Sequence, residues 1–216
     1  MKRIIMALAG ALLAASALPA QAASSLDVPT ASAAPSVDPR ADDTSFDPAA
    51  VAQLGWNSTK SQPAAEDTTA RIATDGKYLY VRFDAAQTER IVSAQPADGK
   101  STGDLVWVDL QPGSSGASYR FASSPDGSSN ATASTGTAPA FAAAGSTYDG
   151  GYTVTMKIPI ADLHGAGGTW NVQFGRTIAG SGQQMVWSHD GNVAQAGTMT
   201  MPASVGAAAP AGATRE

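Results

Sequence analysis

Three side chains near the middle of the chain have the types and spacing to contact a hydroxyl-rich ligand. Residues 105–110 alternate with period two, which predicts a strand with Trp107 and Asp109 on the face opposite its apolar residues. Arg120 occupies the matching face of the next predicted strand, residues 118–123. An indole can stack on a sugar ring, a carboxylate accepts hydrogen bonds from hydroxyls, and a guanidinium donates to them. These side chains could therefore form a patch that contacts the hydroxyls of a sugar; the alternative interpretation is that Trp107 belongs to the core or is covered by a loop.

Two residues of an earlier strand could extend this patch. Residues 78–84 also alternate, with Tyr80 and Arg82 on the face opposite the apolar positions. Both side chains combine a flat surface with hydrogen-bonding groups, so we include them as candidate carbohydrate contacts.

The acidic residues do not form the pair that glycoside hydrolysis needs. That reaction requires two carboxyl groups facing each other across the scissile bond. The three glutamates, Glu66, Glu89 and Glu216, all lie in polar stretches, and most aspartates lie at predicted turns. Asp109 is the only carboxylate on its face of the predicted strand. We predict no catalytic residues and a protein that is not an enzyme.

Metal and cofactor sites have little support in the residue types. The chain has no cysteine, and its two histidines, His164 and His189, are not spaced as a metal-binding pair. We therefore predict no metal site and no cofactor. Calcium at the acidic turn from Asp98 to Asp104 is an open alternative, because clustered oxygen ligands suit that ion.

The distribution of short alternating segments predicts the fold class. Seven or more such strands, separated by Gly, Ser, Asp and Pro, indicate an all-β protein built as an antiparallel two-sheet β-sandwich. Asp47 to Leu54 is expected to add one short N-terminal helix, with Asp47 as its N-cap, Pro48 in its first turn and Gly55 after its end.

The chain ends differ in composition from the middle. Residues 1–22 combine Lys2 and Arg3, an apolar stretch and a small-residue cleavage pattern, which predicts a signal peptide and a periplasmic or secreted protein. Residues 23–41 and 203–216 are rich in Ala, Pro, Ser or Gly, and we expect a disordered linker and a disordered tail. The folded domain is predicted over residues 42–202.

The charge balance limits the partners. The formal net charge of −5 becomes −7 when Lys2 and Arg3 are removed with the signal peptide. Nucleic acids and anionic membranes call for clustered basic residues, which this chain lacks. We expect no nucleic-acid partner and no membrane insertion after signal cleavage; the sequence does not indicate an oligomeric state.

Several motifs occur in an order that resembles a known family, carbohydrate-binding module family 9 and its DOMON-like relatives. The similarity extends over residues 42–202. It is carried by Asp43 to Trp56, Thr69 to Val81, Gly103 to Leu110, Gly150 to Pro159, Trp170 to Arg176, Trp187-Ser188 and Gly197 to Thr200.

The resemblance implies a sandwich fold and a carbohydrate or glycan as partner. Sugar-binding members of the family clamp the ring between two tryptophans. This chain has Ser101 to Gly103 where one of them is expected, and the shortened loop from His189 to Ala196 lacks the other. Trp107 stands where the family often has Glu, whereas Arg120 matches a family arginine.

Three functions follow from these observations. The first is a non-catalytic carbohydrate-binding module of an exported bacterial protein. The second is a haem-binding domain like the DOMON cytochromes, with Met156, Met185, His164 and His189 as candidate axial ligands. The third is a periplasmic protein-interaction domain that kept the fold and lost the sugar site.

Overall fold

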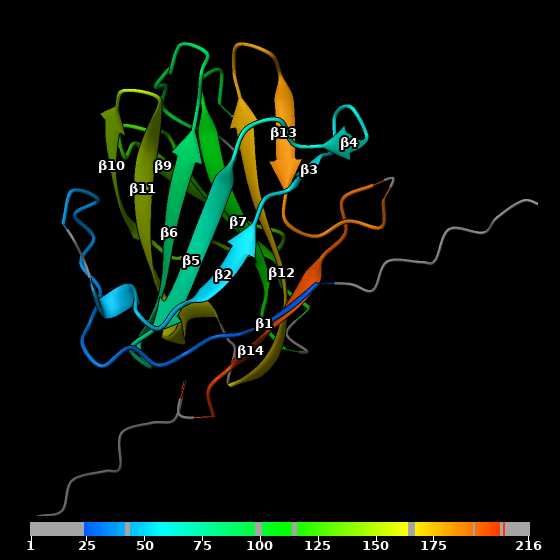
Figure 1. Cartoon of the computed structure of the whole chain (residues 1–216). Helices are drawn as coiled ribbons and strands as arrows, with labels where there is room; N and C mark the ends of the chain where they lie inside the picture. Colours follow the sequence, from blue (N-terminus) through cyan, green and yellow to red (C-terminus); the bar gives the residue numbers. More distant parts are fainter. Residues whose placement is uncertain are drawn as a thin grey trace, which may run out of the picture.

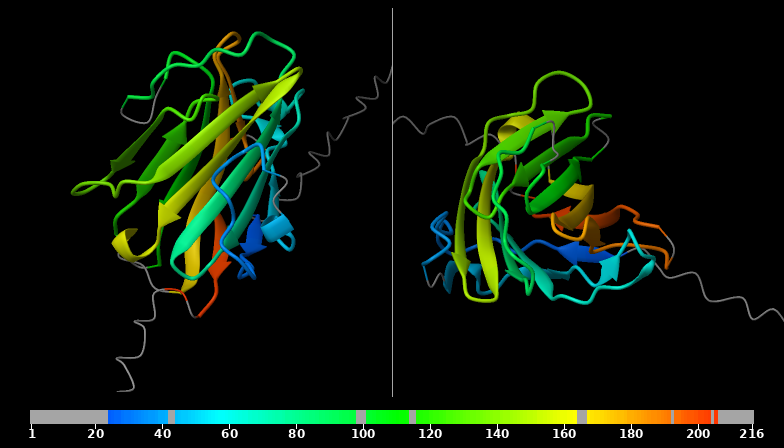
Figure 2. Two further views of the ribbon diagram at one scale, coloured as in Figure 1. Left: turned by 90° about the vertical axis from the view of Figure 1, so that its left-hand side faces the viewer. Right: turned by 90° about the horizontal axis from the view of Figure 1, so that it is seen from above.

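The chain folds into two packed β-sheets (Figures 1 and 2). The computed structural model describes residues 24–41, 44–97, 101–113, 116–163, 167–191, 193–203 and 205. Among these residues every strand pairing is antiparallel except that of β1 with β14. The predicted all-β, two-sheet sandwich is confirmed.

Sheet A forms one layer and sheet B the other. In spatial order, sheet A contains β4 (Gln62–Pro63), β3 (Trp56–Asn57), β13 (Gln183–Val186), β12 (Gly168–Ile178), β7 (Leu105–Gln111), β8 (Tyr119–Ser123) and β9 (Ser129–Ala133), and β14 (Gly197–Met201) joins β12 to β1 (Ser25–Asp27). Sheet B contains β10 (Ala142–Tyr148), β11 (Gly151–Pro159), β6 (Tyr78–Ala86), β5 (Thr68–Thr74) and β2 (Ala50–Gln53). Two 3-10 turns, η1 (Thr44–Phe46) and η2 (Ala161–Leu163), complete the described elements.

The main core lies between the sheets and follows from the period-two alternation. Val106, Val108 and Leu110 of β7 point inward and share one buried cluster with the apolar residues of β6. Phe83 meets Phe174 edge to face at 6.4 Å between ring centroids. Each large apolar side chain buried in this way contributes roughly 1.5–3 kcal/mol. The core therefore fixes which side chains of β7 and β12 face outward.

The predicted helix from Asp47 to Leu54 is wrong. Ala50–Gln53 form the edge strand β2, paired with β5, and only the 3-10 turn η1 precedes it. Ala52 and Leu54 are buried while Val51 and Gln53 are exposed, which is strand alternation and not a helical stripe. Pairing with β5 and burial of alternate residues outweigh the weak helix preference of the alanines.

The segment expected to be a disordered linker, residues 23–41, is ordered over residues 24–41. Ser25–Asp27 form β1 beside β14, and Ala31 N–H donates to the Thr74 carbonyl at 2.7 Å. Figure 1 shows the chain leaving β1 and crossing to sheet B, where η1 precedes the edge strand β2. Composition did not predict this order, because the few apolar residues of the segment, such as Val28, are buried only when the segment packs against the sheets.

Residues 1–23 and 206–216, which include the predicted signal peptide and most of the predicted tail, lie outside the described residues. No helix among the described residues is long and apolar enough to span a membrane.

Candidate functional site

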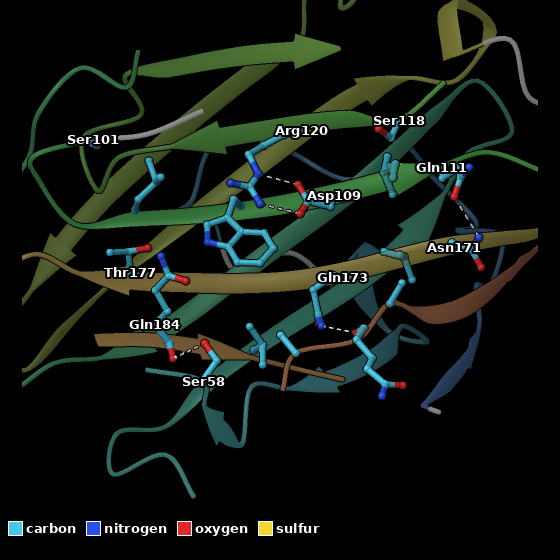
Figure 3. Close-up of a pocket in the computed structure, with 18 residues that line it drawn as sticks. Ser58, Ser101, Asp109, Gln111, Ser118, Arg120, Asn171, Gln173, Thr177 and Gln184 are labelled. Atoms are coloured by element: carbon cyan, nitrogen blue, oxygen red, sulfur yellow. Dashed lines mark hydrogen bonds and ion pairs between the residues drawn. The ribbon is translucent and has the colours of Figure 1, made fainter. Parts of the chain in front are cut away.

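A groove of about 640 Å³ runs over the outer face of sheet A, on the side away from the core (Figure 3). Its volume is within the range of ~300–1,000 Å³ that is usual for small-molecule sites. The strands β7, β8, β12 and β13 supply most of its lining. The outward side chains of these strands therefore decide what the groove can bind.

Strand register arranges these side chains in four successive rungs across the sheet. Rung 1 holds Gln111 and Asn171; rung 2 holds Arg120, Asp109 and Gln173; rung 3 holds Ala122, Trp107, Gly175 and Val186; rung 4 holds Leu105, Thr177 and Gln184. Figure 3 shows Asn171 and Gln111 at one end, Asp109 and Arg120 in the middle, and Thr177 and Gln184 at the other end. An apolar rung thus lies between polar ones.

Asp109 and Arg120 form a bidentate ion pair in rung 2. Arg120 Nε donates to Asp109 Oδ1 and Nη2 donates to Oδ2, both at 2.6 Å. The hydrogen bonds to Asp109 raise the pKa of the guanidinium, so Arg120 stays charged. About one third of each side chain is exposed. Because two of the five N–H groups of the guanidinium are used here, others remain for a ligand.

Trp107 forms the floor of the groove and is almost fully covered, with 6% of its surface exposed. Gly175 lies directly opposite it on β12, and a Cβ at that position would overlap the indole. The Arg120 guanidinium carbon lies 4.5 Å from the ring centroid. Trp107 is therefore covered by the neighbouring strand and by Arg120. Little of its surface is open to the groove.

A short apolar cluster surrounds this floor. Trp107 packs with Trp56, Leu105, Ala122 and Val186 in a cluster separate from the main core. The His189 ring stacks on Trp56 at 4.3 Å with 6° between the planes. No broad aromatic face of these two tryptophans is open to a ligand in this structure.

One wall of the groove is formed by Ala194, Gln195 and Ala196. Gln173 holds it: its amide nitrogen donates to the carbonyls of Ser188 and Gln195, and its amide oxygen accepts from Ser188 N–H at 3.0 Å. Gln173 is 6% exposed. The side-chain amide of Gln173 therefore positions the wall that carries Ala194 and Ala196.

Tyr80 and Arg82 do not extend the patch, because β6 belongs to sheet B and their side chains face the opposite side of the sandwich. Tyr80 is fully buried in a cluster with Phe46, and its hydroxyl donates to Asp75 Oδ2 at 2.9 Å. Arg82 Nη1 donates to the Ala41 carbonyl at 3.2 Å. The sequence did not show to which sheet β6 belongs.

The residues considered for calcium and haem have other partners where they are described. Asp104 is fully buried and accepts N–H groups of Val92 and Ala179 and the side-chain amide of Gln87. Met156 and Met185 lie in the main core. His189 Nδ1 accepts Gly191 N–H at 3.0 Å. His164 and Asp98 lie outside the described residues.

Among the described residues, no group of three or more His, Cys, Asp or Glu side chains could hold a metal ion.

The groove contains polar residues that sequence reasoning did not select. Asn171 and Thr177 lie on β12, where they alternate with the inward Val172 and Phe174. This alternation was visible in the sequence and could have identified the outward face of that strand. Gln184 could not be found in this way, because its place beside β12 depends on strand pairing.

Comparison with known proteins identifies the class of fold. No family model matches the chain, and no curated protein matches it significantly. A candidate carbohydrate-binding protein from Bacteroides uniformis has a TM-score of 0.65 at 16% identity, covering 83% of this chain and 99% of its own.

Two further solved structures from Caldicellulosiruptor kristjanssonii are similar. A family 9 carbohydrate-binding module in complex with cellotriose has a TM-score of 0.61 at 15% identity, covering 88% of this chain and 100% of its own. One in complex with glucose has a TM-score of 0.60 at 14% identity, covering 82% and 95%. The chain thus has the fold of carbohydrate-binding module family 9, as its motif order predicted; the likeness to DOMON domains stays a prediction.

Proposed function

We propose that this protein is a non-catalytic carbohydrate-binding module that holds a neutral glycan in the groove on sheet A. The observation that carries the proposal is the partly exposed Asp109–Arg120 pair beside the covered indole of Trp107. The pair supplies donors and acceptors in fixed positions, which suits hydroxyl groups. The similar modules crystallised with cellotriose and glucose support a sugar as the ligand class.

The charge of the groove favours a neutral ligand. Asp109 and Arg120 are the charged residues among those that line it, and each neutralises the other. The remaining polar lining consists of amides and hydroxyls, such as Gln111 and Ser118. We therefore expect glycan affinity to change little between low and high salt, because screening acts mainly on unpaired charges.

The groove also supports binding without turnover. Its described lining contains one carboxylate, which Arg120 already engages through both oxygens. Glycoside hydrolysis needs a second carboxyl group as acid or base. Cleavage of any bound oligosaccharide by the purified protein, lost in Asp109→Asn, would overturn the non-catalytic assignment.

We propose only a limited contact between Trp107 and the ligand. Since little of Trp107 is exposed, we propose that it supports the ligand as an apolar floor while Arg120 lies between the ring and the solvent. Full stacking of a sugar on the indole would require Arg120 to move away.

The first experiment is a glycan-array screen of the protein followed by titration calorimetry with the best ligands. Arg120→Gln removes the bidentate pair, and affinity should fall by about 10- to 100-fold, as expected for hydrogen bonds that involve a charged group. The melting temperature should change little, because the pair is partly exposed.

Arg71→Gln is the matched control, since Arg71 is an exposed arginine on β5 of sheet B. Equal affinity of the wild-type protein and Arg120→Gln for every bound glycan would refute the proposed site. Failure of all glycans to bind would favour the protein-interaction alternative.

The proposed setting is the periplasm or the medium, after removal of residues 1–22. Mass spectrometry of the protein recovered from an expressing bacterium should give a mature chain that begins at Ala23. Recovery of an intact N-terminus from the cytoplasm would contradict export.

A further inference from the structure

The groove is long in one direction. Its four rungs follow the axis of β7 from Gln111 to Leu105. At about 3.4 Å per residue, neighbouring rungs are roughly 7 Å apart and the outer rungs roughly 20 Å apart. A single sugar ring cannot contact all four rungs, whereas an extended chain of several sugars can.

Hydrogen-bonding groups are available at both ends of this length. At rung 1, Asn171 is exposed and donates to Gln111 Oε1 at 3.1 Å, which leaves other amide atoms of the pair for a ligand. At rung 4, Gln184 is exposed and Thr177 is half-buried. Figure 3 shows these two polar groups on opposite sides of the Asp109–Arg120 pair.

The middle of the groove offers no clamp for one ring. Trp107 is covered, and Trp56 lies beneath His189. Trp170 is fully buried, and Trp187 packs against Phe174 at 5.6 Å between centroids. These are all four tryptophans of the chain. Affinity must then come from many polar contacts spread along the groove.

We propose that the groove binds an internal stretch of an extended glycan that lies along β7 and β12, and that it does not recognise a chain end. This inference rests on the proposed function and adds the form of the ligand to it. It assigns Asn171 and Gln184, in opposite end rungs, as contacts for different sugars of one chain.

The test is calorimetric titration with cello-, xylo- and manno-oligosaccharides of one to six residues. Each is used with a free reducing end and with that end reduced to an alditol. For the series that binds, affinity should rise with each added residue until the groove is filled and then level off. Reduction of the end should change the affinity for the longest member less than twofold.

Two variants locate the two ends of the bound chain. Asn171→Ala and Gln184→Ala should each weaken the longest oligosaccharide by roughly three- to tenfold, the loss for one or two neutral hydrogen bonds. Gln53→Ala, the same change at an exposed amide on β2, is the control and should have no effect.

The outcomes separate this inference from the proposed function. A monosaccharide that binds as tightly as the hexasaccharide, or loss of binding on reduction of the end, would overturn the extended-chain inference while sugar binding stands. Insensitivity of the hexasaccharide to both variants would also overturn it. Absence of binding in all three series, with no glycan bound on the array either, would overturn both proposals.

Discussion

Both outer faces of the sandwich present an aromatic, a cation and a carboxylate from central strands. In sheet A these are Trp107, Arg120 and Asp109; in sheet B Tyr80 and Arg82 are accompanied by Asp84. The groove leaves the first set partly open, whereas residues 28–41 and 44–46 lie over the second set, where Tyr80 is buried against Phe46. The same strand pattern thus gives a candidate binding face on one side and an internal interface on the other.

The contrast shows that what covers a sheet decides the role of its outward residues. Arg82 donates one N–H to the Ala41 carbonyl, and its Nε lies 3.4 Å from Asp84 Oδ1. Both partners of the guanidinium therefore belong to the domain itself. Arg120 is tied to Asp109 but retains an exposed edge. Four substitutions can break or sharpen this comparison.

The largest effect is expected for Trp107→Ala. Removal of a covered indole should lower the free energy of unfolding by about 3–5 kcal/mol. It should also weaken glycan binding, because Arg120 loses the surface on which it rests. Urea unfolding and calorimetry under conditions where the variant is folded measure the two effects. An unchanged stability would mean that the ring is exposed in solution, contrary to the structure.

A smaller loss is expected for Gly175→Ala. The added methyl group would overlap the Trp107 ring, and such overpacking typically costs about 1–3 kcal/mol. The ring must shift to make room, so tryptophan fluorescence should change. Gly55→Ala is the control, because a Cβ there meets nothing within 4 Å. Identical behaviour of the two variants would contradict the close approach of Gly175 and Trp107.

On sheet B, Tyr80→Phe should remove only the hydrogen bond to Asp75. The expected cost is about 0.5–1.5 kcal/mol in the free energy of unfolding. Glycan affinity should stay unchanged, since the residue lies on the covered face. A fall in affinity without a fall in stability would place sheet B in the binding site.

The smallest effect concerns Asp75 and acid. Burial alone would raise its pKa, but N–H groups of Tyr78 and Lys77 and the Tyr80 hydroxyl hold the pKa below its ordinary value of 3.8. The charged form therefore stabilises the fold above that value, and this contribution is lost as the pH falls through the folded pKa. The stability difference between wild type and Asp75→Asn should narrow below about pH 4. A constant difference in urea unfolding across this range would contradict the shift.

The sequence predicted most of the fold because its signal is local. Alternation in residues 78–84 and 105–110 identified β6 and β7 and the faces that form the core. The order of motifs also predicted the class of sandwich. The helix prediction for residues 47–54 was wrong because alanines are compatible with both helix and strand. Pairing with β5 favours the strand.

The candidate site was predictable only in part. Trp107, Asp109 and Arg120 share one face because β7 and β8 are consecutive strands, and the register sets Asp109 opposite Arg120. Tyr80 and Arg82 were placed wrongly since alternation tells which residues face outward but not from which sheet. Gln184 and the wall at residues 194–196 come from distant parts of the chain, and only the assembled sheet brings them together.

The parallel pairing of β1 with β14 has a consequence for how the domain is assembled. This ladder joins the first described strand to the last, so that edge of sheet A can close only after nearly the whole chain is available. Contacts between residues so far apart in sequence carry a high loop-closure cost and slow the folding of β-sandwiches. We therefore expect the rest of the sandwich to form first and β1 to pair with β14 last, in the step that completes the native state.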